Sequence, residues 1–204
     1  MQVESSDVVS GGDGPPDGMS VLDFWRWAFA DLCDDDVKGW FAEWLVGLLL
    51  GLPQTRRISW AGSDHVTPEG VRIEVKASAY WQSWKLIEED GTAKLVEAVS
   101  VNQNSRVAFG SLRSKDVAIY RSDLYIFAFQ RERDPTRWNA LDLTQWEFYA
   151  LTRDQLAKVG TRSISLATLG KLCSSMSAAD FRVKGKAMVQ ALASTRLSEA
   201  GAAS

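Results

Sequence analysis

Residues 62–78 read GSDHVTPEGVRIEVKAS and predict a turn followed by a β-strand. From Val71 to Ser78, polar and apolar residues alternate as they do in a half-buried β-strand. The preceding Pro68-Glu69-Gly70 is a typical turn sequence. A hairpin through this turn returns the chain along the strand, so we expect Asp64 to lie beside Glu74.

Alternation gives the predicted strand one charged and one apolar face: Arg72, Glu74 and Lys76 against Ile73, Val75 and Ala77. A Glu-x-Lys pair alone is usually an exposed salt bridge. With Asp64 across the hairpin, two carboxylates converge beside a lysine. Such hard oxygen ligands suit Mg²⁺ or Mn²⁺, which takes one or two protein carboxylates in phosphate chemistry.

A third carboxylate comes from a helix predicted over about residues 37–50 and capped by the acidic run 34–36. Glycines recur on both sides of Glu43, and a bulky stripe runs beside them, formed by Trp40, Trp44 and Leu48. Gly47 costs about 1 kcal/mol relative to alanine in mid-helix, which predicts that a sheet or a ligand approaches closely there.

Other patterns complete an α/β order. The capping box Ser20–Asp23 predicts a first helix through Leu32. The apolar segment 123–129 predicts a strand covered on both faces. The sequence also predicts strands at 57–60, near 97–101 and 106–109, and at 145–151, and helices that begin at Thr152 and at Ser177.

Composition limits the class of protein. The chain has 204 residues, 46% hydrophobic and 24% charged, which is enough for one folded domain and excludes a disordered or collagenous chain. The longest apolar run, 44–50, is too short to cross a bilayer. Two cysteines and one histidine indicate neither a disulfide framework nor a zinc site, so we expect a cytoplasmic protein without a membrane partner.

The net charge of −3 is unevenly divided. Residues 1–36 carry nine acids against Arg26, a charge of −8, which leaves +5 for the rest.

We predict that the chain has four parts: a flexible acidic leader (1–18), an α/β core with a mixed four- to five-stranded sheet flanked by helices (19–160), a small C-terminal helical extension (161–196) and a flexible tail (197–204).

The order of a helical Glu43, Asp64 and then Glu74-Val75-Lys76 in a strand resembles the PD-(D/E)xK, or restriction-endonuclease-like, nuclease superfamily. The resemblance covers roughly residues 20–155. It implies a restriction-endonuclease-like core and divalent-metal-dependent hydrolysis of phosphodiester bonds. The chain has Ser63 where the nominal motif has proline, which lowers the specificity of the motif without changing a ligand.

The resemblance also implies roles. Asp64, Glu74 and the Val75 main-chain carbonyl would hold Mg²⁺ or Mn²⁺, and Lys76 would orient or help to deprotonate the attacking water. Glu43 would complete the site through water or a second metal. Gln82 is similar to a polar residue that some members place near the site.

Nucleic-acid contacts are expected from cationic and aromatic side chains: Arg56, Arg57, Trp81, Trp84, Arg106, Arg113 and Lys115. Arg131, Arg133 and Arg137 form another basic cluster. Most of the nine tryptophans are expected in the core, because a domain of this size needs large buried aromatics.

We therefore expect a nuclease, with DNA favoured over RNA, of a restriction, defence or mobile-element type, and a homodimer or larger assembly is possible. One alternative is a catalytically inactive nuclease-fold module that binds nucleic acid or a protein partner. A third reading is a tryptophan-rich domain that binds a small ligand or carbohydrate, which requires several exposed tryptophans on one concave face.

Overall fold

The computed structural model describes residues 4–7, 19–59, 61–81, 108–110, 112 and 120–202. Their elements follow in chain order: α1 (Val21–Ala28), α2 (Asp35–Leu50), β1 (His65–Val66), β2 (Arg72–Ala79), β3 (Ala108–Phe109), β4 (Leu124–Gln130), the 3₁₀ helix η3 (Leu143–Gln145), β5 (Trp146–Thr152), α3 (Arg153–Val159), β6 (Ile164–Ser165), α4 (Leu166–Leu172) and α5 (Ala178–Ala202).

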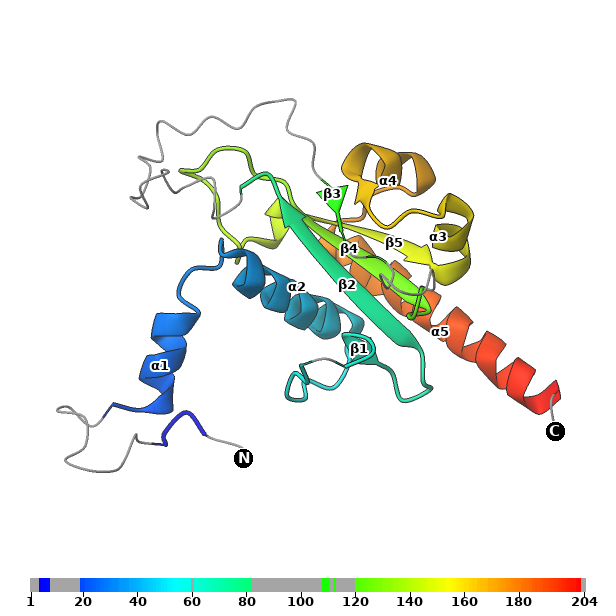
Figure 1. Cartoon of the computed structure of the whole chain (residues 1–204), viewed down its shortest axis with the longest axis horizontal. Helices are drawn as coiled ribbons and strands as arrows, with labels where there is room; N and C mark the ends of the chain where they lie inside the picture. The colour runs from blue at the N-terminus through cyan, green and yellow to red at the C-terminus, as the bar shows by residue number, and fades with distance from the viewer. Residues whose placement is uncertain are drawn as a thin grey trace.

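A mixed four-stranded sheet organises the fold, in the order β1-β2-β4-β5 (Figure 1). β2 and β4 are parallel, with Glu74 opposite Tyr125, whereas β1 and β5 pair antiparallel with their neighbours. β3 and β6 form a separate two-stranded sheet. The predicted α/β class with a mixed sheet flanked by helices is confirmed.

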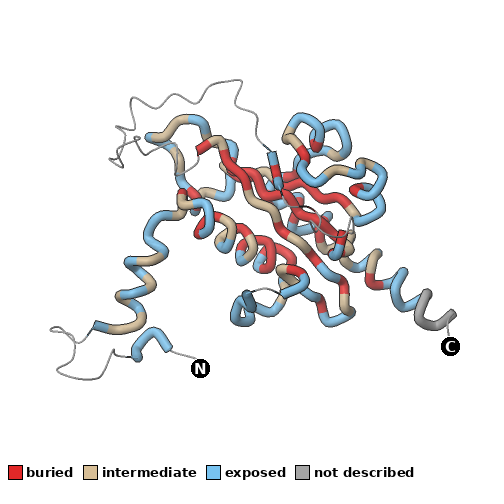
Figure 2. Tube along the Cα trace, viewed as in Figure 1, coloured by how far each residue is buried: buried red, intermediate tan, exposed pale blue. Residues whose placement is uncertain are grey.

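Helices cover both faces of the sheet, and each face has its own apolar cluster. α2 and α5 pack on the face that carries Ile73 and Val75 of β2. The opposite face, with Tyr125 and Phe127 of β4, packs against α3, α4 and β6. Every residue of β4 is consequently buried, as Figure 2 shows for the centre of the molecule and as its apolar sequence predicts.

Local signals set most element boundaries. Ser20 and Asp23 form the predicted capping box of α1, and Thr152 and Gln155 form that of α3. Asp34 caps α2 by accepting hydrogen bonds from two main-chain N–H groups. The predicted strands at 123–129 and 145–151 are β4 and β5, each shifted by one residue.

Helix α1 departs from its prediction in length and in packing. It ends at Ala28 instead of continuing through Leu32, because the Asp31 side chain accepts from Cys33 N–H and the chain turns into the cap of α2. No residue of α1 is buried. In Figures 1 and 2 this helix extends away from the body of the molecule.

The structure differs from two further predictions, and two others fall wholly or largely outside the residues that it describes. Residues 57–59 form no strand, and β1 begins after Asp64 instead of ending before it. α5 runs to Ala202, into the segment predicted as a tail, and its last turns carry serine and threonine hydroxyls bonded to main-chain carbonyls. The strand predicted near 97–101 and most of the leader lie outside the described residues.

A membrane-crossing helix would have to be both long and apolar, and none within the described ranges satisfies both conditions.

Candidate functional site

The hairpin between β1 and β2 brings Asp64 to the edge of the sheet, as predicted. Gly70 N–H donates to the Thr67 carbonyl at 2.8 Å, and Gly70 adopts φ 80°, which favours glycine. His65 pairs with Ile73 in this antiparallel hairpin, so Asp64, one residue earlier, lies beside Glu74, one residue further along β2. The Val75 N–H donates to Asp64 Oδ2 at 2.7 Å and fixes the carboxylate against the strand.

Glu74 and Lys76 share one face of β2, also as predicted. Lys76 Nζ lies 2.7 Å from Glu74 Oε1, and both side chains are about one-fifth exposed (21% and 23%). Ser122 Oγ donates to the other Glu74 oxygen at 3.4 Å. Sequence reasoning missed Ser122, since it lies 48 positions away and only the parallel pairing of β2 with β4 brings it there.

Glu43 reaches the same region from α2. Arg57 binds its carboxylate with two hydrogen bonds, Nε to Oε2 at 2.6 Å and Nη2 to Oε1 at 3.2 Å. The hydrogen bond to Glu43 raises the pKa of the Arg57 guanidinium, and the nearby Asp64 carboxylate raises it by a smaller amount. The sequence predicts that Arg57 contacts nucleic acid, whereas in the structure its guanidinium binds the Glu43 carboxylate.

Asp64 is the most perturbed carboxyl group of the site. Its pKa is raised from the usual 3.8 to about 7, chiefly by burial and next by the Glu74 carboxylate. The Val75 N–H opposes this rise, Glu43 adds a smaller increase, and Lys76 lowers the pKa slightly. Glu74, Glu43 and Lys76 therefore all lie close enough to Asp64 to change its pKa.

This donor set fits a hard divalent cation. Asp64 and Glu74 supply two carboxylates, and a cation between them would relieve the repulsion that raises the pKa of Asp64. The N–H and C=O of one strand residue point to the same side, so the Val75 carbonyl faces the edge where Asp64 lies. Within the described part of the chain, no three His, Cys, Asp or Glu side chains are grouped to hold a metal by themselves.

His65 and Gly47 form the contact that joins the hairpin to α2. A Cβ at Gly47 would lie 2.8 Å from His65 Cε1, and His65 Nε2 lies 2.8 Å from the Glu43 carbonyl oxygen. The close approach predicted at Gly47 is therefore made by a histidine ring. At Gly39 a Cβ would meet nothing within 4 Å, so that glycine does not share this role.

A groove of about 530 Å³ opens beside the carboxylates, between α2 and the hairpin. Glu43 and Asp64 line it together with apolar and cationic side chains, among them Trp40, Trp44, Arg56, Arg57 and Ile58. Trp40 and Trp44 are 39% and 49% exposed, so these two do not share the core position expected for most of the tryptophans. The signal was in the sequence, since both lie within four positions of Glu43 on one helix.

The remaining predicted contacts are distributed differently. Trp81 is 2% exposed and its Nε1–H donates to the Arg133 carbonyl at 3.0 Å, so the structure gives it a packing role in place of the predicted nucleic-acid contact. Arg56 is exposed and lines the groove. Five candidates lie outside the described residues: Gln82, Trp84, Arg106, Arg113 and Lys115.

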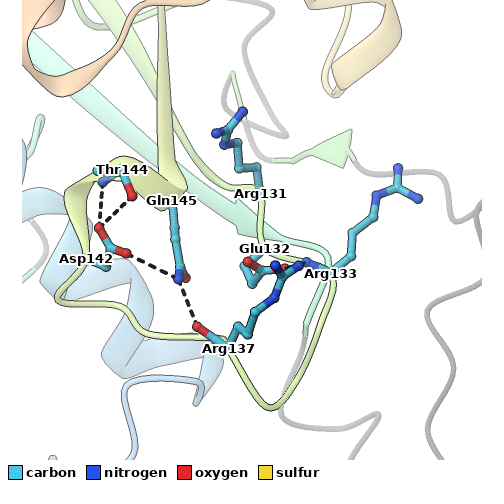
Figure 3. Close-up of a pocket in the computed structure, with 7 residues that line it drawn as sticks. All are labelled: Arg131, Glu132, Arg133, Arg137, Asp142, Thr144 and Gln145. Carbon is cyan, nitrogen blue, oxygen red and sulfur yellow. Dashed lines mark hydrogen bonds and ion pairs between the residues drawn. The ribbon is translucent and has the colours of Figure 1, made fainter.

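The basic cluster Arg131, Arg133 and Arg137 lines a separate hollow of about 780 Å³ beyond the end of β4 (Figure 3). Arg137 binds Glu132 and Asp134 at 3.2 and 3.1 Å, and in Figure 3 its side chain runs toward Glu132. Arg133 lies over the Tyr80 ring. Because carboxylates balance much of this charge, the smaller groove with Asp64 is the better candidate site.

No protein-family model matches this chain, and a search of curated proteins finds no relative.

Proposed function

We propose that this chain is a divalent-metal-dependent nuclease with a restriction-endonuclease-like core, and that it acts on DNA as an endonuclease. The observation that carries the proposal is Asp64, which is bonded to β2 through the Val75 N–H and crowded by Glu74 beside Lys76. Half-buried acids that repel one another, next to a groove, are typical of functional sites.

In this proposal Asp64, Glu74 and the Val75 carbonyl would hold Mg²⁺ or Mn²⁺. The ion, when bound, stabilises charge on the scissile phosphate and lowers the pKa of a bound water. Lys76 adds a positive charge and hydrogen-bond donors where the attacking oxygen approaches. Ser122 restrains one Glu74 oxygen, so that the other remains with Lys76.

Glu43 and Arg57 have a different task. Their ion pair keeps Glu43 at the mouth of the groove, and the guanidinium partly balances Asp64. An incoming phosphate competes for Arg57, because guanidinium binds phosphate and carboxylate in the same two-pronged way. Glu43, once freed from Arg57, would be available as a further carboxylate for the site.

The second candidate, a catalytically inactive module that binds nucleic acid or a protein, is favoured by a specific observation. Glu43 and Glu74 both already have cationic partners, Arg57 and Lys76. A site that no longer binds metal could persist in this self-neutralised form.

Cleavage assays separate the two. The full chain is incubated with circular, linear, single-stranded and RNA substrates, with Mg²⁺, Mn²⁺ or EDTA. We expect metal-dependent cutting that Asp64→Ala and Lys76→Ala each reduce at least about 100-fold. Lys184→Ala removes an exposed lysine from α5 and serves as the matched control, expected to cut like wild type. Cutting that survives in both site variants would reject the assignment, and binding without cutting would favour the inactive module.

A further inference from the structure

The groove beside the carboxylates has aromatic walls that the hydrolytic chemistry does not use. On α2, Glu43 lies three residues and Trp44 four residues after Trp40, so both are neighbours of Trp40 on the helix surface, and all three side chains line the groove. Ile58, which is 68% exposed, lines the same groove from the segment that follows α2. Large apolar side chains left exposed around a concave surface indicate a binding site.

The charges around these rings suit a phosphate chain. Arg56 is exposed and, within the described residues, has no carboxylate partner. Arg57 lies with its guanidinium carbon 5.6 Å from the centre of the Trp40 ring, so a cation and an aromatic face are held together. Aromatic faces interleaved with arginines are the combination with which proteins hold single strands, since bases stack on the rings while phosphates meet the cations.

The same features disfavour a continuous duplex as the ligand in this groove. A base within a duplex has both faces covered by its neighbours, so it offers an indole nothing on which to stack. The chain carries a net charge of −3, which weakens its general attraction for any nucleic-acid backbone, so stacking has to supply much of the affinity. Stacking compensates for this weak attraction only where a base is already unpaired.

We infer that the groove formed by Trp40, Trp44, Arg56 and Ile58 binds an unpaired nucleotide, and that the substrate is nucleic acid with a single-stranded segment beside the scissile phosphate. The inference rests on the proposed function for the identity of the neighbouring carboxylates. The stacking itself rests on the exposed rings and does not require cleavage.

The test measures binding apart from cutting. Fluorescein-labelled oligothymidylate and a blunt two-stranded duplex of equal length are titrated with the full chain in EDTA, and fluorescence anisotropy gives each affinity. We expect wild type to bind the single strand more tightly than the duplex. Trp44→Ala should weaken single-strand binding about 5- to 100-fold, and Trp44→Phe should restore most of it.

Trp27 provides the matched control. It is 81% exposed on α1 and does not line the groove, so Trp27→Ala removes an equally large exposed indole without touching the site. We expect its affinity to stay within about twofold of wild type, on the scale of an exposed side chain outside the binding site. Equal loss in Trp27→Ala and Trp44→Ala would overturn the inference, as would unchanged binding by Trp44→Ala or a preference for the duplex.

The other outcomes separate this inference from the proposed function. If metal-dependent cutting and single-strand binding are both unchanged in Trp44→Ala, the nuclease proposal stands and the stacking site is rejected. If single-strand binding depends on Trp44 but wild type does not cut, the stacking site stands and the nuclease proposal is rejected. Self-association lost in Trp44→Ala, with no single-strand binding, would assign this face to a second copy of the chain and overturn the inference.

Discussion

Two aspartates are bonded to the same strand in the same way but have opposite surroundings. Asp64 accepts the Val75 N–H at 2.7 Å, and Asp123 accepts the Arg72 N–H at 2.8 Å. Asp123 also pairs with Arg153 and with Arg196, whose Nη1 lies 2.6 Å from Oδ2. Asp64 instead has the carboxylates of Glu74 and Glu43 as neighbours.

The difference separates a structural carboxylate from a candidate functional one. Two guanidinium groups compensate Asp123 for its burial, and the three side chains tie the start of β4 to α3 and α5. Asp64 is buried against like charge, an arrangement that lowers stability and creates a demand for a cation. Burial alone therefore does not mark the site; the sign of the surrounding charge does.

The largest expected effect is on cleavage. Asp64→Asn should reduce the rate at saturating Mg²⁺ by about 100- to 1000-fold, because it removes a charged ligand while it keeps the size of the side chain. Asp123→Asn, measured per folded molecule, should keep most of the activity. If the two variants lost equal activity, the contrast between the aspartates would fail.

The pH dependence of stability comes next. The pKa of Asp64 is about 7 in the folded chain and near 3.8 unfolded, so between these values the folded chain holds a proton that the unfolded chain has released. The stabilisation is complete below about pH 4 and is lost as pH rises through 7. Urea unfolding at pH 5 and pH 8 should show wild type losing a few kcal/mol more than Asp64→Asn.

Mg²⁺ gives this pH prediction an internal control. At pH 8, added Mg²⁺ should raise the unfolding midpoint of wild type, since an ion that binds only the folded state stabilises it by mass action. It should not raise the midpoint of Asp64→Asn. An equal response in both would show that the ion binds elsewhere.

Asp123→Ala tests the compensated aspartate and should destabilise the fold by about 2 kcal/mol, because it leaves the Arg72 N–H and two guanidinium groups without their shared acceptor. Urea titration at pH 7 measures the loss. Lys184→Ala, which breaks the exposed pair with Asp180 at 4.0 Å, should change stability by less than about 0.5 kcal/mol. Comparable losses would mean that Asp123 is an ordinary surface pair.

The smallest expected effect is on the stability of α2, the helix that packs against the hairpin carrying Asp64. Gly39→Ala should stabilise α2 by up to about 1 kcal/mol, because its Cβ meets nothing within 4 Å. Gly47→Ala should destabilise by about 1 kcal/mol, since its Cβ would lie 2.8 Å from His65 Cε1. Thermal unfolding of the pair gives the sign, and stabilisation by both would show that His65 is free to move.

Much of the site was predictable because its signals are local. Alternation along β2 and the turn at 68–70 act over a few residues, and they correctly set Asp64, Glu74 and Lys76 side by side. Capping boxes at Ser20 and Thr152 are equally local and were predicted correctly. Each of these features depends on backbone hydrogen bonds between near neighbours, which the residue types themselves dictate.

Local sequence patterns were enough to predict the strand that carries the acid and the lysine, the hairpin that adds Asp64, and the helix that carries Glu43. Packing between distant elements brings Arg57 to Glu43 and His65 to Gly47, and it leaves Trp44 exposed while Trp81 is buried. The two groups of features differ in range: burial and charge pairing depend on elements that meet across long separations in the chain, and no local pattern encodes which face a neighbouring element will cover.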